Sequence, residues 1–324
     1  MIGSFNVKVT QRMRVSFEFT VRRNVTIVCG DSGTGKTTLF NMLVAHTRER
    51  ENSGVTVQCD RPCVALIDLD WENQLAGITD SIVFIDEGMR GVFSEDFARV
   101  LSSSSNYFVI ISREALSNIP YSIDEIYEIK ASGKRHTFVP RYTRRDGYRY
   151  SLSKALPKKD FDTLLTEDSR SGLQFFKARF DNQGVSCCSS KGNANIVAWL
   201  KAHRGEYVFA IADGAAFGAQ SERVMKLQDE FKDSIALCLP ESFEWLILKS
   251  GVVKADDLQE VLDDPAAFID SSKDGSWEQF FSAYLRQITE KTPFAYNKSE
   301  LAEAYTLSKN ADRVMALIAC RNIK

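Results

Sequence analysis

The residues best suited to chemistry form a glycine-rich loop near the N-terminus. The β-branched run Val25–Val28 leads into residues 30–38, which match the pattern G-x-x-x-x-G-K-[ST] at every fixed position. Glycines at positions 30, 33 and 35 allow backbone N–H groups to turn toward a polyphosphate. A helix that begins at the end of the loop points its positive end at the same anion. The pattern predicts a nucleotide-binding loop between a strand and a helix.

We expect this loop to bind ATP together with Mg²⁺. Lys36 is expected to reach the β- and γ-phosphates, and the Thr37 hydroxyl is expected to bind Mg²⁺. The residues expected to contact the nucleotide are Gly30, Asp31, Ser32, Gly33, Thr34, Gly35, Lys36, Thr37 and Thr38.

Two acidic residues follow an apolar run about fifty residues beyond Lys36. The run Ile82–Ile85 is typical of a buried strand, and Asp86 and Glu87 come directly after it. At the carboxyl end of a central parallel strand, Asp86 can hold Mg²⁺ through water and Glu87 can polarise the attacking water. We therefore expect Asp86 as a metal-binding residue and Glu87 as a catalytic residue.

The elements around the loop are expected to form a parallel sheet. Residues 5–21 alternate apolar and polar side chains, which predicts a β-hairpin beside the strand that leads into the loop. A further apolar run, Tyr107–Ile111, predicts another strand and ends in Ser112 and Arg113.

Residues 1–130 resemble the ABC-like or AAA-like P-loop ATPases, on the loop and the Asp86-Glu87 pair. In the additional-strand class of these enzymes a polar residue senses the γ-phosphate, which makes Ser112 a candidate and Arg113 a neighbour within reach. No Leu-Ser-Gly-Gly-Gln signature is present, and the interval between Lys36 and Asp86 is too short for the helical subdomain of an ABC ATPase. The resemblance therefore does not extend to a head-to-tail nucleotide sandwich.

Length and composition place further bounds on the protein. The chain has 324 residues, enough for about two domains, and its 41 basic and 43 acidic residues give a net charge of −2. A nucleic-acid partner must therefore be bound by a local patch. No apolar run approaches the ~20 residues of a membrane helix. We expect a cytoplasmic protein with no membrane partner, whose seven cysteines are reduced thiols.

The stretch Lys130–Tyr150 is basic and aromatic and has two interpretations. It carries seven Lys or Arg residues against one Asp, with Phe138, Tyr142, Tyr148 and Tyr150 between them. Arginines contact phosphates and aromatic rings stack on bases, so the stretch could bind nucleic acid. It could equally be a solvated β-hairpin, with turns at Ser132-Gly133 and Asp146-Gly147, that links two domains. We expect a first domain over residues 1–150 and a second over residues 151–324.

The second domain resembles the Toprim fold of OLD-family nucleases and abortive-infection effectors of phage defence. Strands and helices alternate, Glu167 follows the first strand, Gly192 and Asn193 match a glycine turn, and Asp213 follows a later strand. The resemblance implies that Glu167 and Asp213 bind metal and act in phosphodiester cleavage. The segment Pro240–Leu246 also resembles a late motif of such effectors, and the chain after Asp256 is expected to be helical.

One departure from the Toprim pattern is important. Ala215 stands where the second aspartate is expected, and two-metal cleavage needs several convergent oxygens. Two hypotheses therefore stay open: an ATP-regulated, metal-dependent nuclease in phage defence or mobile-element biology, and an ATP-dependent switch whose inactive Toprim-like domain binds a protein or nucleic-acid partner. Either could act as a homo-oligomer. The expected fold class is α/β, with a P-loop parallel-sheet domain followed by a smaller Toprim-like domain and a helical C-terminal tail.

Overall fold

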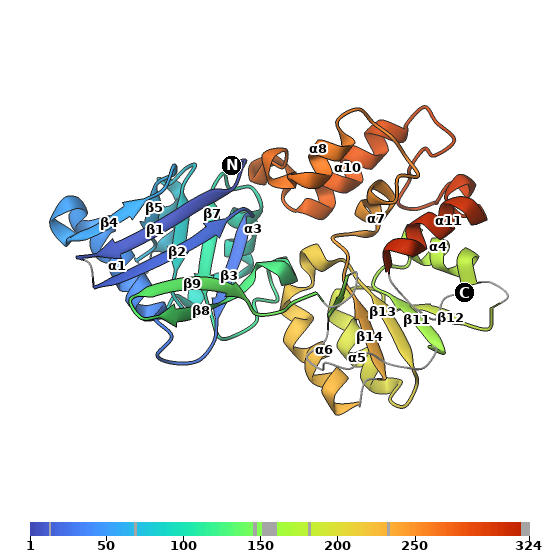
Figure 1. Cartoon of the computed structure of the whole chain (residues 1–324), viewed down its shortest axis with the longest axis horizontal. Coiled ribbons are helices and arrows are strands. Elements are labelled where there is room, and N and C mark those ends of the chain that lie inside the picture. The colour runs from blue at the N-terminus through green and yellow to red at the C-terminus, as the bar shows by residue number, and fades with distance from the viewer. Residues whose placement is uncertain are drawn as a thin grey trace. The chain divides into compact units, whose positions relative to one another are not determined.

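The chain forms two compact units that each combine helices with a β-sheet (Figure 1). The computed structural model describes residues 1–12, 14–67, 70–144, 148–150, 161–180, 183–231 and 234–318. Unit 1 consists of Met1–Arg141 with Asp264–Ser276, and unit 2 of Tyr142–Asp263 with Trp277–Lys324. The α/β class is therefore as expected. We expected one boundary at residue 150, whereas the chain divides after Arg141 and returns to unit 1 for Asp264–Ser276.

The described part of unit 1 contains a nine-stranded sheet in the order β4-β1-β2-β9-β8-β3-β7-β6-β5. The strands β5, β6, β7, β3 and β8 run parallel to their neighbours within that group, and β1 pairs antiparallel with β2 and β4. The bounds are β1 (Phe5–Gln11), β2 (Val15–Val21), β3 (Val25–Cys29), β4 (Val55–Gln58), β5 (Cys63–Ala65), β6 (Ile82–Ile85), β7 (Tyr107–Ile111), β8 (Ile126–Ser132) and β9 (Arg135–Pro140).

The hairpin β1–β2 forms as expected, but its expected position beside the loop strand was wrong. The strands β9 and β8 lie between β2 and β3, with β9 parallel to β2 and β8 parallel to β3. This insertion comes from a segment about a hundred residues further along the chain, so the local alternation of residues 5–21 carried no sign of it.

The burial of the strands follows from what covers their faces. All residues of β3, β6 and β7 are buried, because helices or other strands cover both faces of the parallel part of the sheet. In β1 buried and exposed residues alternate, because only one face of this strand packs on the core. The helices of unit 1 are α1 (Lys36–Glu49), α2 (Trp71–Ala76), α3 (Glu95–Ser102) and α9 (Ser271–Asp274).

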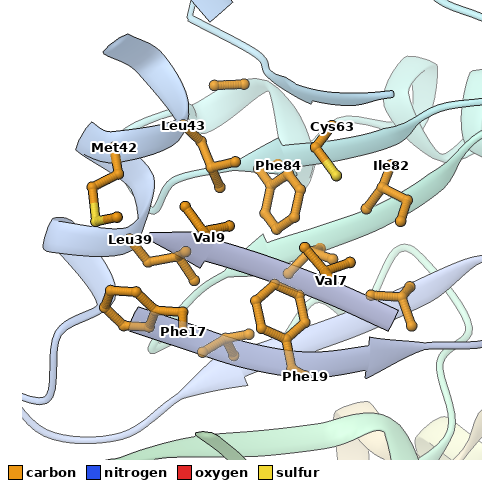
Figure 2. Close-up of a cluster of buried hydrophobic side chains, with 14 of the residues drawn as sticks. Val7, Val9, Phe17, Phe19, Leu39, Met42, Leu43, Cys63, Ile82 and Phe84 are labelled. Carbon is orange, nitrogen blue, oxygen red and sulfur yellow. The ribbon is translucent and has the colours of Figure 1, made fainter. Parts of the chain in front are cut away.

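The helix α1 lies in the middle of the unit 1 core. It contacts β1 and β4 of the antiparallel part and β5 and β6 of the parallel part. Its residues Leu39, Met42 and Leu43 pack in one cluster with side chains from both parts, as Figure 2 shows for Val9 and Phe84. The helix that follows the glycine-rich loop is thus held from two sides.

Unit 2 is built on a smaller sheet in the order β10-β14-β13-β11-β12. The strands β11 to β14 are parallel, and β10 pairs antiparallel with β14 at one edge. The strand bounds are β10 (Arg149–Tyr150), β11 (Thr163–Thr166), β12 (Ser186–Ser189), β13 (Val208–Ile211) and β14 (Ile235–Cys238).

Helices complete unit 2, and the chain after Asp256 is mostly helical, as expected. The bounds are α4 (Ser171–Phe180), α5 (Ile196–Ala202), α6 (Gly218–Glu230), α7 (Phe243–Lys249), α8 (Leu258–Asp263), α10 (Trp277–Thr289) and α11 (Ser308–Met315). Across both units, none of the described helices combines the length and the apolar character needed to cross a membrane.

We expect Leu43→Ala to lower the free energy of unfolding of unit 1 by about 2–5 kcal/mol, because a fully buried leucine between two packed layers leaves a cavity. Leu43 is 0% exposed, whereas Val100 of the same unit is 39% exposed. Urea unfolding of both variants measures the effect, and Val100→Ala should change stability by less than about 0.5 kcal/mol. Equal effects of the two substitutions would contradict the central position of α1.

Candidate functional site

The glycine-rich loop of unit 1 has a backbone that requires its glycines. Gly30, Gly33 and Gly35 have φ angles of 106°, 83° and 102°, in the left-handed region that side chains disfavour. A Cβ atom on Gly35 would also lie 3.2 Å from the His136 ring and 3.3 Å from the Phe17 ring. The spacing of the motif is therefore a consequence of backbone geometry and of close packing beneath the loop.

The Lys36 ammonium is held by oxygen atoms of the loop itself. Its Nζ donates hydrogen bonds to the carbonyl oxygens of Gly30 and Asp31, both at 2.6 Å, and lies 3.3 Å from the Thr34 hydroxyl. The residue is 5% exposed. The loop therefore wraps around the Lys36 ammonium and supplies its hydrogen-bond acceptors. A phosphate oxygen bound there would compete with these carbonyls for the ammonium.

The acidic pair after β6 lies near this loop. Burial raises the pKa of Asp86, and the nearby positive charge of Lys36 acts in the opposite direction. Glu87 forms an ion pair with Arg113 at 3.2 Å between Oε2 and Nε, and Arg113 donates a hydrogen bond from Nη2 to the Ser32 hydroxyl at 3.2 Å. Arg113 thus connects the loop with Glu87.

The hydroxyl of Ser112, the expected nucleotide sensor, forms hydrogen bonds within a local turn. Its hydroxyl donates to the carbonyl oxygen of Glu114 at 2.7 Å and accepts from the Glu114 N–H at 3.2 Å, and the residue is 4% exposed. Of the two residues at the end of β7, Arg113 therefore has the contacts with the loop. Thr37 and Thr38, in the first turn of α1, are exposed.

The two acids expected in unit 2 come together at the carboxyl ends of two neighbouring strands in the interior of its sheet. Glu167 follows β11 and Asp213 lies two residues beyond β13, and these strands are parallel neighbours. The Asp213 N–H donates to Glu167 Oε2 at 3.2 Å, and Asp213 Oδ1 accepts from the Phe243 N–H at 3.2 Å. A cavity of about 30 Å³, room for one or two waters, is lined by both residues and by Asp168.

Further charged residues surround this pair, and the sequence analysis missed them. Glu244 of α7 is 1% exposed, and Lys298 lies 3.7 Å from its Oε1. The same lysine lies 2.7 Å from Glu278 Oε1 of α10, and the Tyr296 hydroxyl donates to Glu244 Oε1 at 2.6 Å. The likeness of the segment 240–246 to a late Toprim motif was a signal for Glu244, whereas Glu278 and Lys298 lie in segments that no motif marked.

The carboxylates of this site, which we call the acidic site of unit 2, destabilise one another's charge. Burial raises the pKa of Glu167 to about 7 and raises that of Asp168 as well. Burial, followed by repulsion from Glu278, raises the pKa of Asp213 well above its usual value. Lys298 opposes these shifts but is one cation among several acids. A further cation bound here would relieve the repulsion.

The acidic site offers two carboxylates to a divalent ion, which is too few for a pair of ions. Glu167 and Asp213 offer converging carboxylates, but Ala215, which is 6% exposed, supplies no ligand at the third expected position. Among the residues that the structure describes, no group of three or more His, Cys, Asp or Glu side chains could hold a metal ion. A single Mg²⁺ held by these two carboxylates would need about four further oxygen ligands, more than the one or two waters for which the cavity has room.

In unit 1, Thr37 offers a hydroxyl and Asp86 a carboxylate near Lys36, and these groups could bind an ion that arrives with a nucleotide. Thr37 follows Lys36 in the first turn of α1 and is exposed, so its hydroxyl is accessible. Asp86 lies close enough to Lys36 for the positive charge of the lysine to oppose the rise in the pKa of the carboxyl group that burial causes. Both are ligand types that Mg²⁺ takes beside substrate phosphates.

Most of the described residues of the basic and aromatic stretch Lys130–Tyr150 are exposed or half-buried, but three of its aromatic rings pack against the protein. Its first part is the antiparallel hairpin β8–β9, with Gly133 in the turn at a φ of 62°. Phe138 stacks on Phe19 with ring centroids 4.0 Å apart, and Tyr142 and Tyr150 are 7% and 1% exposed. Tyr142 and Tyr150 are therefore not available to stack on bases in this conformation, and Phe19 covers one face of the half-buried Phe138. The expected turn at Asp146-Gly147 lies outside the described residues.

Comparison with known proteins does not test either family resemblance. No protein-family model matches the chain, no curated protein matches its sequence and no solved structure matches its fold. The two candidate sites rest on the positions and the chemistry of their own side chains.

Proposed function

We propose that unit 1 binds and hydrolyses ATP with Mg²⁺. The observation that carries this proposal is the loop geometry: three glycines in the left-handed region and the Lys36 ammonium enclosed by loop oxygens at the start of a 14-residue helix. The order of strands supports it too, because β7 lies as an additional strand between β3, which leads into the loop, and β6, which leads to Asp86. This order agrees with the additional-strand class that the sequence resembles.

The residues around the loop divide the work of nucleotide hydrolysis. Lys36 exchanges the carbonyls of Gly30 and Asp31 for phosphate oxygens, and the N–H groups of the loop bind the same phosphates. Thr37 and Asp86 would hold Mg²⁺, and the ion would neutralise phosphate charge. Arg113, which donates to the Ser32 hydroxyl of the loop, would turn to the γ-phosphate, and its departure from Glu87 would leave that carboxylate to orient water.

For unit 2 we propose metal-dependent hydrolysis of a phosphodiester, under the control of ATP. This proposal is supported by the convergence of Glu167 and Asp213 on one small cavity and by the raised pKa values that mark crowded carboxylates. A divalent ion held there supplies charge neutralisation and an activated water. Lys298 keeps a second positive charge beside the same carboxylates. With the likeness to OLD-family nucleases, this points to nucleic-acid cleavage in phage defence or mobile-element biology.

A second function is favoured by two specific observations. Ala215 supplies no oxygen where a third ligand is expected, and Lys298 already neutralises Glu244 and Glu278. Unit 2 would then be an inactive Toprim-like domain, and the protein an ATP-dependent switch that binds a protein or nucleic-acid partner, as a monomer or a homo-oligomer.

We expect Lys36→Ala to weaken ATP binding at least about tenfold, which corresponds to 1.4 kcal/mol, because the substitution removes the charge beside the phosphates. Isothermal titration with Mg²⁺ and ATP measures the affinity. Lys8, which lies on β1 and pairs with Glu18, provides the control: Lys8→Ala should leave the affinity unchanged. Unchanged affinity in Lys36→Ala would defeat the assignment of the loop.

We expect the purified protein to cleave nucleic acid with Mg²⁺ or Mn²⁺ in the presence of ATP, and Glu167→Gln to lose at least about a hundredfold in rate, the scale of a lost catalytic group. Gel assays with single- and double-stranded DNA and RNA, with and without ATP, measure cleavage. Glu222→Gln is the matched control, because Glu222 lies on the exposed side of α6 in an ion pair with Lys226.

The outcomes separate the two functions. Cleavage that Glu167→Gln abolishes and Glu222→Gln retains supports the nuclease. Intact ATP binding with no cleavage of any substrate supports the switch, and equal cleavage by both variants rules out the acidic site of unit 2 as its source.

A further inference from the structure

Among the residues that the structure describes, the cavity of the acidic site of unit 2 is lined by four carboxylates and one cation. The acids are Glu167, Asp168, Asp213 and Glu244, and the cation is Lys298. The cavity of about 30 Å³ is too small for an ion together with the waters that would complete its coordination. A divalent ion can therefore enter only if the cavity widens or a side chain leaves its wall.

The Lys298 ammonium is held at this wall by two carboxylates. Its Nζ lies 2.7 Å from Glu278 Oε1 and 3.7 Å from Glu244 Oε1. Glu244 is 1% exposed, and an unpaired charge at such a buried position is costly. The lysine thus gives these acids the neutralisation that a bound metal ion would also give them.

The side chain of Lys298 can leave the cavity while its backbone stays in place. The side chain is 28% exposed, and the Lys298 carbonyl oxygen accepts a hydrogen bond from the Ser171 N–H at 3.1 Å. The residue lies between α10, which ends at Thr289, and a short helical turn that begins at Glu303. A lysine side chain is long and flexible, so its ammonium can turn into solvent without a shift of the surrounding elements. Its withdrawal would widen the cavity and leave Glu244 without its cation.

We propose that the Lys298 ammonium competes with divalent ions for the acidic site, and that an ion binds when the lysine side chain turns out into solvent. The ammonium and the ion repel each other in a poorly solvated cavity, and the same carboxylates attract both. The exchange replaces one positive charge by two among several acids. Lys298 thereby lowers the affinity of the site for free ions.

This inference rests on the proposed function in one respect, namely that the acidic site takes a divalent ion. It does not require that the site cleaves a phosphodiester. It also accounts for the small size of the cavity, because the structure then describes the state in which the lysine is inside.

The test measures Mn²⁺ binding to the nucleotide-free full-length protein by electron paramagnetic resonance of the free ion. Lys298→Met removes the charge and keeps an unbranched side chain. We expect this variant to bind Mn²⁺ at least about tenfold more tightly than the wild type, because the repulsion between two cations is lost. Lys291→Met is the matched control at an exposed lysine that also follows α10, and it should leave the affinity unchanged.

A double variant locates the ion. Addition of Glu167→Gln to Lys298→Met should remove the gain in affinity, and a gain that survives would overturn the inference. Affinity in Lys298→Met that equals or falls below that of the wild type would overturn it as well, without bearing on cleavage. Tighter binding without cleavage of any nucleic acid would support the inference and reject the nuclease. No binding to either protein would reject both.

The wild type supplies a readout that needs no variant. Acetylation of lysines by an N-hydroxysuccinimide ester, followed by mass spectrometry of peptides, reports how accessible each amine is. We expect Lys298 to react faster as the Mn²⁺ concentration rises, because the ion displaces its side chain into solvent, while the rate at Lys291 stays the same. Unchanged labelling of Lys298 throughout the titration would overturn the inference even if Lys298→Met fails to fold.

Discussion

The burial of α1 between two parts of one curled sheet is the packing constraint on which the rest of unit 1 depends. Its residues Leu39 and Leu43 are 0% exposed, so the helix cannot shift without opening the core. Since α1 begins at Lys36, the same packing fixes the end of the glycine-rich loop and the direction of its N–H groups. The edge strands β4 and β5 stand at opposite ends of the strand order and both contact α1, so the sheet curls around this helix.

The acidic site of unit 2 depends on a different balance. Glu167 and Asp213 follow the carboxyl ends of two parallel neighbouring strands, β11 and β13. Helices of the C-terminal half add Glu244 and Glu278. Clustered carboxylates in a poorly solvated site are costly unless protonated or neutralised, and Lys298 supplies part of that neutralisation. Lys298 is therefore a cation that the chain itself places among these carboxylates. That balance explains why both a catalytic and a non-catalytic function are chemically reasonable for the same fold.

The parts of the structure that the sequence predicted are those with local causes. The loop, the helix after it and the acids after β6 each follow from a few adjacent residues, because glycine conformations and apolar runs act over short distances. The position of β8 and β9 between β2 and β3 depends on pairing across about a hundred residues, which no local pattern encodes. The sequence did not indicate Glu278 and Lys298 for the same reason, since only the folded chain brings them near Glu244. The position of Ser112 after a strand predicts a nucleotide sensor, but its hydroxyl donates a hydrogen bond to the Glu114 carbonyl oxygen in a local turn.

The most direct test of the account is hydrogen–deuterium exchange of the full chain with and without Mg²⁺ and a non-hydrolysable ATP analogue. Phosphates bound by loop N–H groups, and a helix start stabilised by them, should slow exchange in peptides that cover residues 30–38. We also expect slowed exchange around Asp86 and Arg113. Binding of the analogue that leaves exchange in these peptides unchanged, or that slows exchange in unit 2 alone, would contradict it.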